Sequence, residues 1–213
     1  MIPVVDLDSI RVCWLQLEKE GFVLYGFLLY TNADTGIWSF IHNGGMLDLD
    51  HLTGDCCALF VLDRPPRDFV ADAQQNDHVW YRYFSESYGV RPATAAEATT
   101  VAHRPVTQGA GFSSNSLHSL YGCVVVIGSE NQVAAESLLG GPAIDRDEIA
   151  KVLVNFGLDY SAVPCITWFR SLDDTAFEVV DLKEITDQHS ARNFLRRYFT
   201  SATFNQLFSV VRV

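Results

Sequence analysis

Residues 156–169 read FGLDYSAVPCITWF, and they join an apolar helical pattern to an apolar run typical of a buried strand. Upstream, Ile149, Val152, Leu153 and Phe156 recur on one face of a helix, and Gly157 is a residue type that ends helices. Downstream, the run from Cys165 to Phe169 favours a strand, with Pro164 directly before it. The segment therefore predicts a helix, a connection through Val163–Pro164, and a strand.

The residues that follow predict a second strand and a helix. The polar segment 172–175 is typical of a turn, and Ala176–Leu182 favours a strand that returns beside the first. Apolar residues then recur at positions i, i+3, i+4, i+7, i+8 and i+11, namely Ala191, Phe194, Leu195, Tyr198, Phe199 and Ala202. This spacing predicts one amphipathic helix.

The N-terminal residues predict strands on both sides of a helix. Ile10–Leu17 and Phe22–Tyr30 are apolar runs separated by the polar residues 18–21, so we expect a hairpin of two strands. A helix is expected from Thr35, with Asp34 available as its N-cap, to Gly54. It is expected to kink at the glycines of residues 43–45. Another buried strand is predicted for residues 56–62.

Residues 64–144 form the least regular part of the chain. One aromatic-rich helix is expected from Phe69 to Tyr88. The segment from Arg104 to Ser119 is rich in Gly, Ser and Asn and predicts an exposed loop, and residues 121–127 predict a strand. We expect residues 1–213 to be a single domain and residues 64–144 to be an insertion within it.

The order of the expected elements resembles the thioredoxin-like fold superfamily. The strand from Phe22, the helix from Thr35 and the strand from Cys56 are similar to the N-terminal βαβ half of that family. Pro164 matches the family's cis-proline, and the helix starting near Asp187 matches its terminal helix. The resemblance implies an α/β fold with a thioredoxin-like central mixed sheet, flanking helices, a cis Val163–Pro164 bond and a long insertion.

One part of the family pattern is missing. Redox-active members carry Cys-x-x-Cys just after the first core strand, where the following helix lowers the pKa of the first thiol. Here residues 30–38 read YTNADTGIW and contain no cysteine. Because dithiol exchange needs two neighbouring thiols, the resemblance implies the fold and argues against the usual activity.

The charge of the chain disfavours nucleic acid and membrane as direct partners. The formal net charge is −11, and such a field repels phosphate backbones and anionic lipid. The strongest basic group is Arg192, Arg196 and Arg197, which we interpret as a solvated helix face; a site for an acidic partner or a phosphate is the alternative. No apolar run reaches the length of a membrane span.

The cysteines and the chain start favour a cytoplasmic protein. Residues 1–8 carry no basic region typical of a secretory leader. The five cysteines are odd in number, stand in apolar contexts and lack disulfide-scaffold spacing: Cys13, Cys56, Cys57, Cys123 and Cys165. We therefore expect reduced core thiols. Cys56 and Cys57 would point to opposite faces of a strand, so a shared metal is disfavoured.

Other combinations of polar residues provide no complete motif. His51 with Asp48, Asp50 and Asp55 contains suitable ligands for a divalent ion, but the spacing fits no known loop, and we expect no metal. Gly109-Ala-Gly111 does not open a capped helix after a strand, so no dinucleotide or other cofactor is expected.

A serine–histidine combination in the insertion is also incomplete. Ser113-Ser-Asn-Ser116 with His118 resembles a nucleophile and a base, but no G-x-S-x-G turn or positioned acid accompanies them. Flexible-loop composition explains these residues, and a hydrolase site around Ser116 and His118 remains the alternative.

We therefore expect a non-catalytic thioredoxin-like binding or adaptor protein in a bacterial-type multi-protein assembly, with a protein partner. The expected binding residues are Val163, Pro164 and Cys165, because the resemblance places the cis-proline loop beside the substrate surface. The aromatic residues of the helix at 69–88 pack in the core or contact a partner. An alternative function is single-cysteine redox or glutathione-linked chemistry at Cys165, and a homo-oligomer stays open.

Overall fold

The computed structural model describes residues 1–4, 7–76, 78–88, 90–92, 115–120, 123–128, 146–171 and 177–209. The chain forms two compact units. The first contains residues 1–66 and 142–213, and the second contains residues 67–141. No helix in these described ranges is long and apolar enough to cross a membrane.

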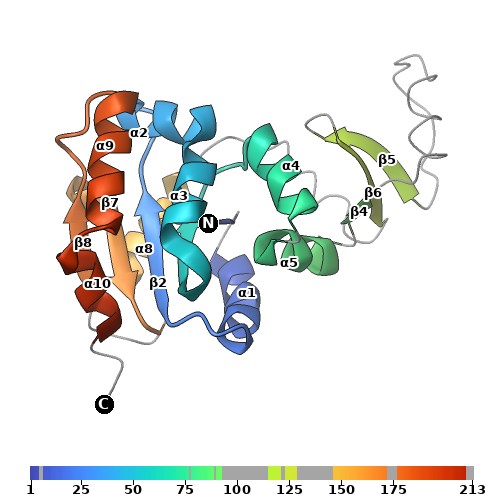
Figure 1. Cartoon of the computed structure of the whole chain (residues 1–213), viewed down its shortest axis with the longest axis horizontal. Helices are drawn as coiled ribbons and strands as arrows, with labels where there is room; N and C mark the ends of the chain where they lie inside the picture. The colour runs from blue at the N-terminus through green and yellow to red at the C-terminus, as the bar shows by residue number, and fades with distance from the viewer. Residues whose placement is uncertain are drawn as a thin grey trace. The chain divides into compact units, whose positions relative to one another are not determined.

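The first unit is an α/β fold built on a five-stranded mixed sheet (Figure 1). The strand order is β1-β3-β2-β7-β8. β1 and β2 both pair with β3 in parallel, whereas β7 runs antiparallel to β2 and β8 antiparallel to β7. The strands are β1 (Ile2–Pro3), β2 (Leu24–Leu29), β3 (Cys57–Val61), β7 (Cys165–Phe169) and β8 (Glu178–Asp181).

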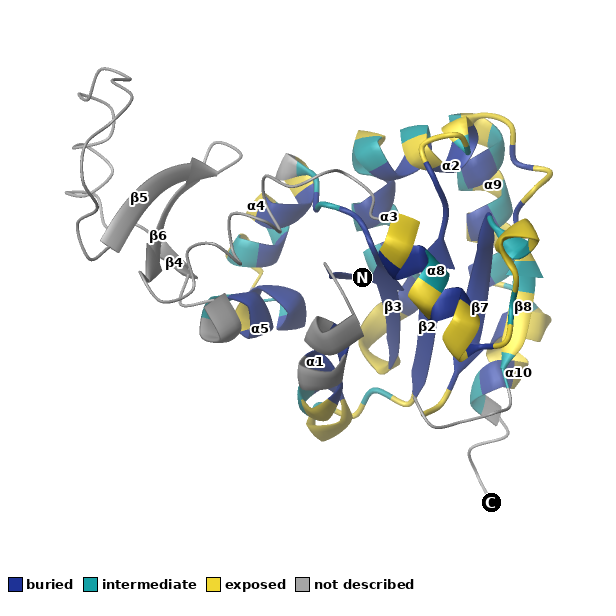
Figure 2. Ribbon diagram, turned by 180° about the vertical axis from the view of Figure 1, so that it is seen from behind, coloured by how far each residue is buried: buried dark blue, intermediate teal, exposed yellow. Residues whose placement is uncertain are grey.

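Helices cover both faces of this sheet. α2 and α3 lie with α9 and α10 on one face, and α1 lies with α8 on the other (Figures 1 and 2). The helical elements are α1 (Leu7–Lys19), α2 (Thr35–Phe40), the π-turn η1 (Ile41–Gly45), α3 (Met46–Thr53), the 3₁₀ turn η2 (Gly54–Cys56), α8 (Arg146–Asn155), the 3₁₀ turn η3 (Tyr160–Ala162), α9 (Gln188–Phe199) and α10 (Ala202–Ser209).

The core is dominated by the central strands and their aromatic residues. All residues of β2, β3 and β7 are buried, whereas most of β8 is exposed (Figure 2). Phe27 stacks on Phe169 with ring centroids 5.3 Å apart. On the other face, Gly26 pairs with Trp168, and a Cβ at residue 26 would lie 2.5 Å from the indole ring. A glycine is therefore needed there to admit Trp168.

The strand expected at Ile10–Leu17 is wrong, because residues 7–19 form α1. Ile10, Cys13, Trp14 and Leu17 are buried at the i, i+3, i+4, i+7 spacing of a helix, whereas Leu15 is 62% exposed. The run is apolar at so many positions that an alternating and a helical pattern both fit it. The expected hairpin turn is the end of this helix, where Gly21 has a φ of 90°.

The other expected elements of this unit are largely confirmed. The helix from Thr35 breaks at Asn43 and Gly44, where Gly44 has a φ of 84°, and resumes as α3. The terminal helix ends at Phe199, and Ala202 begins α10 instead of extending the same helix. Cys56 lies in η2 and is exposed, so the expectation that it packs in the core is wrong; Cys57 is buried.

The described residues of the second unit form two helices and three antiparallel strands. The helix expected at 69–88 is two helices, α4 (Arg67–Gln75) and α5 (Val79–Tyr88). Trp80 and Phe84 are buried and stack with centroids 5.1 Å apart, so these rings form a core. The sheet order is β4-β6-β5, with β4 (Val90–Pro92), β5 (Asn115–Leu120) and β6 (Cys123–Gly128).

The loop expected from Arg104 to Ser119 is wrong at its end, since residues 115–119 belong to β5. Pairing of β5 with β6 supplies backbone hydrogen bonds that loop composition does not reveal. The remainder of that expected loop and the turn at 172–175 lie outside the described residues.

Candidate functional site

The carboxyl ends of β2 and β3 lie at one edge of the central sheet, because the two strands are parallel. β7 begins at the same edge, since it is antiparallel to β2 and Leu29 pairs with Cys165. We call Tyr30–Asp34, Asp63 and Val163–Cys165 together the carboxyl edge. Ligand sites of open α/β sheets concentrate at this end of the strands.

The three expected binding residues lie together at the carboxyl edge. The Val163–Pro164 peptide bond is cis, as the resemblance implied. The Pro164 carbonyl accepts a hydrogen bond of 3.0 Å from the backbone N–H of Leu182, which follows β8. Pro164 and Cys165 are buried and Val163 is half-buried, so Val163 is the residue of the three that offers side-chain surface to a ligand.

The Cys165 thiol is buried and its pKa is raised, which is the opposite of an activated thiol. Its side chain is buried, and burial, together with the Asp181 carboxylate, raises the pKa of the thiol to about 11, against a smaller lowering by Lys183. Reactive cysteines have lowered pKa values and partial exposure. At neutral pH, Cys165 is therefore a protonated core thiol.

A closed polar turn follows β2 at residues 31–34, where the sequence carries no cysteine. The Asp34 carboxylate accepts hydrogen bonds from the backbone N–H of Thr31 at 2.7 Å and from its hydroxyl at 2.9 Å. The Thr31 hydroxyl oxygen in turn accepts from the Ala33 N–H at 3.2 Å. Asp34 is the N-cap residue of α2 as expected, but its carboxylate bonds to Thr31 and not to the helix N–H groups.

A buried polar cluster lies beside this turn, and the sequence did not indicate it. The Tyr30 hydroxyl donates to Oδ2 of Asp63, and His42 Nε2 lies 3.0 Å from the same oxygen. The Arg64 backbone N–H donates to Oδ1 of Asp63 at 2.6 Å. The Asp63 side chain is fully buried. Each carboxylate oxygen therefore has a hydrogen-bond partner, as a buried carboxylate requires.

The three side chains of this cluster come from separate elements. Tyr30 follows β2, Asp63 follows β3 and His42 lies in η1. Burial and the neighbouring Asp63 raise the pKa of Tyr30 well above its usual value, so its hydroxyl remains a donor. Sequence motifs did not reveal this cluster, because Asp63 stands 33 positions after Tyr30 and 21 positions after His42.

This cluster links structural elements by hydrogen bonds and does not pair a nucleophile with a base. Asp63 orients the His42 imidazole, as an acid orients a catalytic base. Within the described ranges, however, no Ser, Thr or Cys side chain bonds to that imidazole. The cluster therefore ties the ends of β2 and β3 to the kink between α2 and α3.

Two exposed aromatic residues adjoin the carboxyl edge. Trp38, in the helix that begins there, is 37% exposed and packs on the His42 ring at 4.6 Å between centroids. Tyr160 is 45% exposed and lies in η3, three residues before Val163. The carboxyl edge thus has hydrogen-bonded polar residues in its interior and exposed aromatic rings at its surface.

The other sequence candidates lie elsewhere. Asp48 pairs with Arg192 at 2.8 Å, and no three His, Cys, Asp or Glu side chains of the described residues are grouped for a metal ion. Ser116 and His118 occupy alternate positions of β5 in the second unit, opposite Ile127 and Val125. No protein-family model, curated protein or solved structure matches this chain.

Proposed function

We propose that this protein is a non-catalytic thioredoxin-like binding protein that contacts a protein partner at the carboxyl edge. The order βαβ, then two antiparallel strands and a terminal helix on one mixed sheet, supports the thioredoxin-like part of the proposal. It acts, in this proposal, as an adaptor in a multi-protein assembly of a bacterial-type cytosol. The buried free thiols Cys13, Cys57 and Cys165 fit a reducing compartment.

The observation that carries the proposal is the polar turn at residues 31–34. Thr31 and Asp34 bond to each other at the position of the family's nucleophile, and this position has no thiol. The neighbouring Cys165 is buried with a raised pKa. In this proposal the carboxyl edge corresponds to the family's binding surface, and its described residues offer no thiol pair for dithiol exchange.

The exposed residues around the edge are suited to protein recognition. Tyr and Trp are enriched among residues that dominate binding energy at interfaces, because one ring buries a large area with few rotatable bonds. Trp38 presents such a ring on α2, and Tyr160 presents another in η3, three residues before Val163. The Tyr30–His42–Asp63 cluster holds the strand ends in place, and such preorganisation lowers the entropy lost on binding.

The alternative, redox or glutathione-linked chemistry at Cys165, requires a different local structure. The sulfur would have to become exposed and its pKa would have to fall before the thiolate could attack a disulfide. No observation at the described edge favours this function over binding.

Photo-crosslinking tests where the partner binds. A photoreactive phenylalanine analogue placed at Tyr160 should form a covalent adduct with a defined protein partner, and the same analogue at Leu15, on exposed α1 surface, should not. An adduct with the mass of two chains would identify a homo-oligomer. Equal crosslinking from both positions would contradict binding at the carboxyl edge.

An insulin-reduction assay tests the absence of redox catalysis. With dithiothreitol as reductant, the protein should give no rate above that of an albumin control. Sustained turnover above the control, lost in Cys165→Ala, would overturn the non-catalytic proposal in favour of the single-cysteine alternative.

A further inference from the structure

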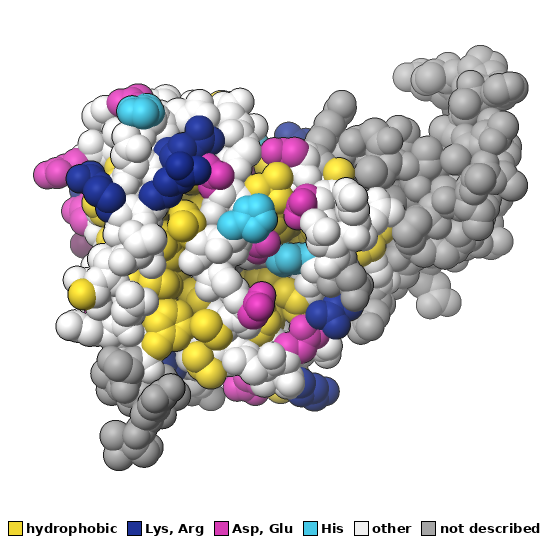
Figure 3. All heavy atoms as spheres, viewed as in Figure 1, with side chains coloured by type: hydrophobic (Ala, Val, Ile, Leu, Met, Phe, Trp, Pro, Cys, Tyr) yellow, Lys and Arg dark blue, Asp and Glu magenta, His cyan; other side chains and the backbone are white. Residues whose placement is uncertain are grey.

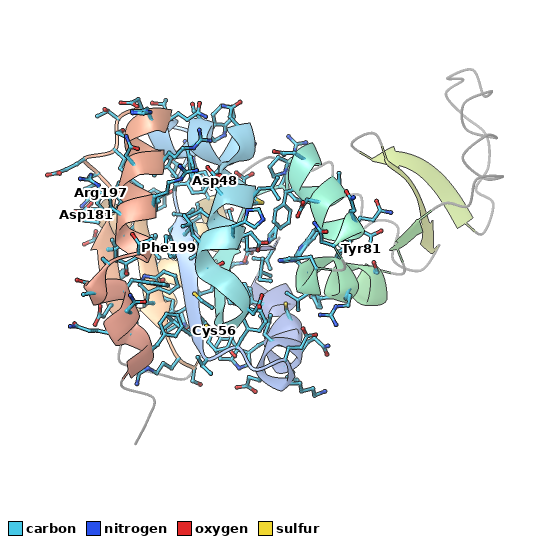
Figure 4. All side chains as sticks on the ribbon, viewed as in Figure 1. Asp48, Cys56, Tyr81, Asp181, Arg197 and Phe199 are labelled. Atoms are coloured by element: carbon cyan, nitrogen blue, oxygen red, sulfur yellow. The ribbon has the colours of Figure 1, made fainter. Side chains whose placement is uncertain are left out.

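A second surface feature lies on α3 and α9, away from the carboxyl edge. The two helices form an open pocket of about 500 Å³, lined by Asp48, His51, Leu52, Arg196, Arg197 and Thr200. We call it the arginine pocket. Figure 3 shows Lys and Arg side chains gathered over α9, and Figure 4 labels Asp48 and Arg197 on the two helices.

The pocket carries an excess of positive charge. The Asp48 carboxylate binds Arg192 Nε at 2.8 Å, and Arg196 lies 3.6 Å from its other oxygen. Arg192 is also stacked over the Phe40 ring at 5.8 Å, which holds it against Asp48. One carboxylate is therefore shared between two guanidinium groups.

Arg197 is the cation of the pocket that is available to a ligand. Its Nε donates to the Asn193 carbonyl at 3.3 Å, and it forms no ion pair with any described acidic residue. Its side chain is exposed. The terminal nitrogens of a guanidinium group can bind the two oxygens of a carboxylate in a bidentate arrangement.

The groups around the arginine pocket favour a carboxylate over a phosphate. The Thr200 hydroxyl donates to the Arg196 carbonyl at 2.8 Å, so its proton is already used. The carboxyl end of α9 adds a partial negative charge, and the chain has a net charge of −11. Both oppose a dianionic phosphate or a polyanion more than they oppose a single carboxylate.

We propose that the arginine pocket binds a single aspartate or glutamate carboxylate on a peptide segment of a protein partner, with Arg196 and Arg197 as the binding cations. The carboxylate would bind the exposed guanidinium group of Arg196 or Arg197, which line the pocket together with His51. This inference concerns a different surface from the carboxyl edge and stands whether or not that edge binds a protein.

Fluorescence anisotropy with the full-length chain tests the proposal. The probes are a labelled, C-terminally amidated peptide GSGEGSG, which carries a single carboxylate, and its glutamine counterpart GSGQGSG, which carries none. We expect the glutamate peptide to bind at least about tenfold more tightly. Arg197→Gln should weaken that binding about fivefold or more, the loss expected for one charge-assisted hydrogen bond. Arg197→Lys, which keeps the charge but not the planar fork, should give an intermediate loss.

The control separates local recognition from net charge. Lys19→Gln, at the exposed end of α1, makes the same change in charge and should alter binding less than about twofold. Arg197→Gln should keep the wild-type urea midpoint, because its exposed side chain bonds to one backbone carbonyl. Equal binding of the two peptides, equal effects of the two variants, or tighter binding of inorganic phosphate than of the glutamate peptide would overturn the proposal.

Discussion

Tyr30 and Asp63 are joined inside the protein by a hydrogen bond from the phenol hydroxyl to the carboxylate, although 33 positions separate them in the chain. The bond connects the ends of two parallel strands and is accompanied by His42, 3.0 Å from the same oxygen. Each donor to a buried carboxylate stabilises the folded protein, because loss of one donor leaves the buried charge without a hydrogen-bond partner.

Tyr30→Phe should therefore destabilise the protein. Removal of one donor from the buried Asp63 carboxylate is expected to lower the free energy of unfolding by about 1–3 kcal/mol, measured by urea denaturation. Tyr160→Phe removes a hydroxyl from a side chain that is 45% exposed and serves as the matched control, with little expected change. Equal midpoints for the two variants would show that the buried bond contributes nothing to stability.

Iodoacetamide labelling should distinguish the cysteines by exposure. Cys165 is buried with a pKa raised to about 11, so its thiolate is scarce at pH 7.5, whereas Cys56 is exposed. We expect Cys56 to be alkylated first and Cys165 to react only at the rate of unfolding, as read by peptide mass spectrometry. Faster labelling of Cys165 than of Cys56 in the folded protein would support the redox alternative.

The capping box of α9 predicts a pH-dependent contribution to stability. The backbone N–H groups of Ser190 and His189 donate to the Asp187 carboxylate, and the pKa of this group is lowered below its usual value of 3.8. A group whose pKa is depressed by folding stabilises the native state above its unfolded pKa, and this stabilisation is lost as the pH falls through the folded value.

Asp187→Asn keeps an oxygen acceptor and removes the titration. We expect the wild type to exceed the variant in urea midpoint at pH 6, with the difference shrinking as the pH falls below 3.8 and through the lowered pKa of Asp187. Glu184→Gln, an exposed change three residues earlier, serves as the control. A difference between Asp187→Asn and the wild type that is constant with pH would contradict the assignment.

Gly36→Ala should destabilise the packing of α2 against the chain before α9. A Cβ at residue 36 would lie 2.7 Å from the Asp187 backbone nitrogen and 3.0 Å from the Ile185 carbonyl oxygen. Backbone atoms cannot rotate away as a side chain does, so we expect a loss of about 1–3 kcal/mol. This value is the net loss, after the gain of about 1 kcal/mol that alanine gives in helix propensity. The measurement is urea denaturation, with Ser39→Ala on the same helix as the control; a stabilised Gly36→Ala would show that the contact relaxes freely.

Much of the fold was predictable from residues that are close together in the chain. The buried strands β2, β3 and β7 are continuous apolar runs, and α9 repeats its apolar residues at helical spacing. The cis bond before β7 was expected from the resemblance around Pro164. Such signals are local, because propensity and periodicity act over one or two turns of backbone.

The error at α1 shows where local signals fail. Ile10–Leu17 is apolar at enough positions to fit a strand or a helix. Packing resolves the choice: one helical face buries Ile10, Cys13, Trp14 and Leu17 and leaves Leu15 in solvent. The burial of each residue depends on the sheet beneath it, which no window of sequence contains.

The two candidate sites are non-local for the same reason. Asp48 and Arg192 meet across 144 positions, and Tyr30 meets Asp63 only because β2 and β3 are neighbours in the sheet. The amino-acid order alone accounts for β2, β3 and β7, for α9 and for the absence of a dithiol after β2. Only the tertiary structure creates the Tyr30–His42–Asp63 cluster, the burial of Cys165 and the arginine pocket. Hydrogen bonds and ion pairs depend on distances of a few ångströms, and here they join residues that are remote in sequence.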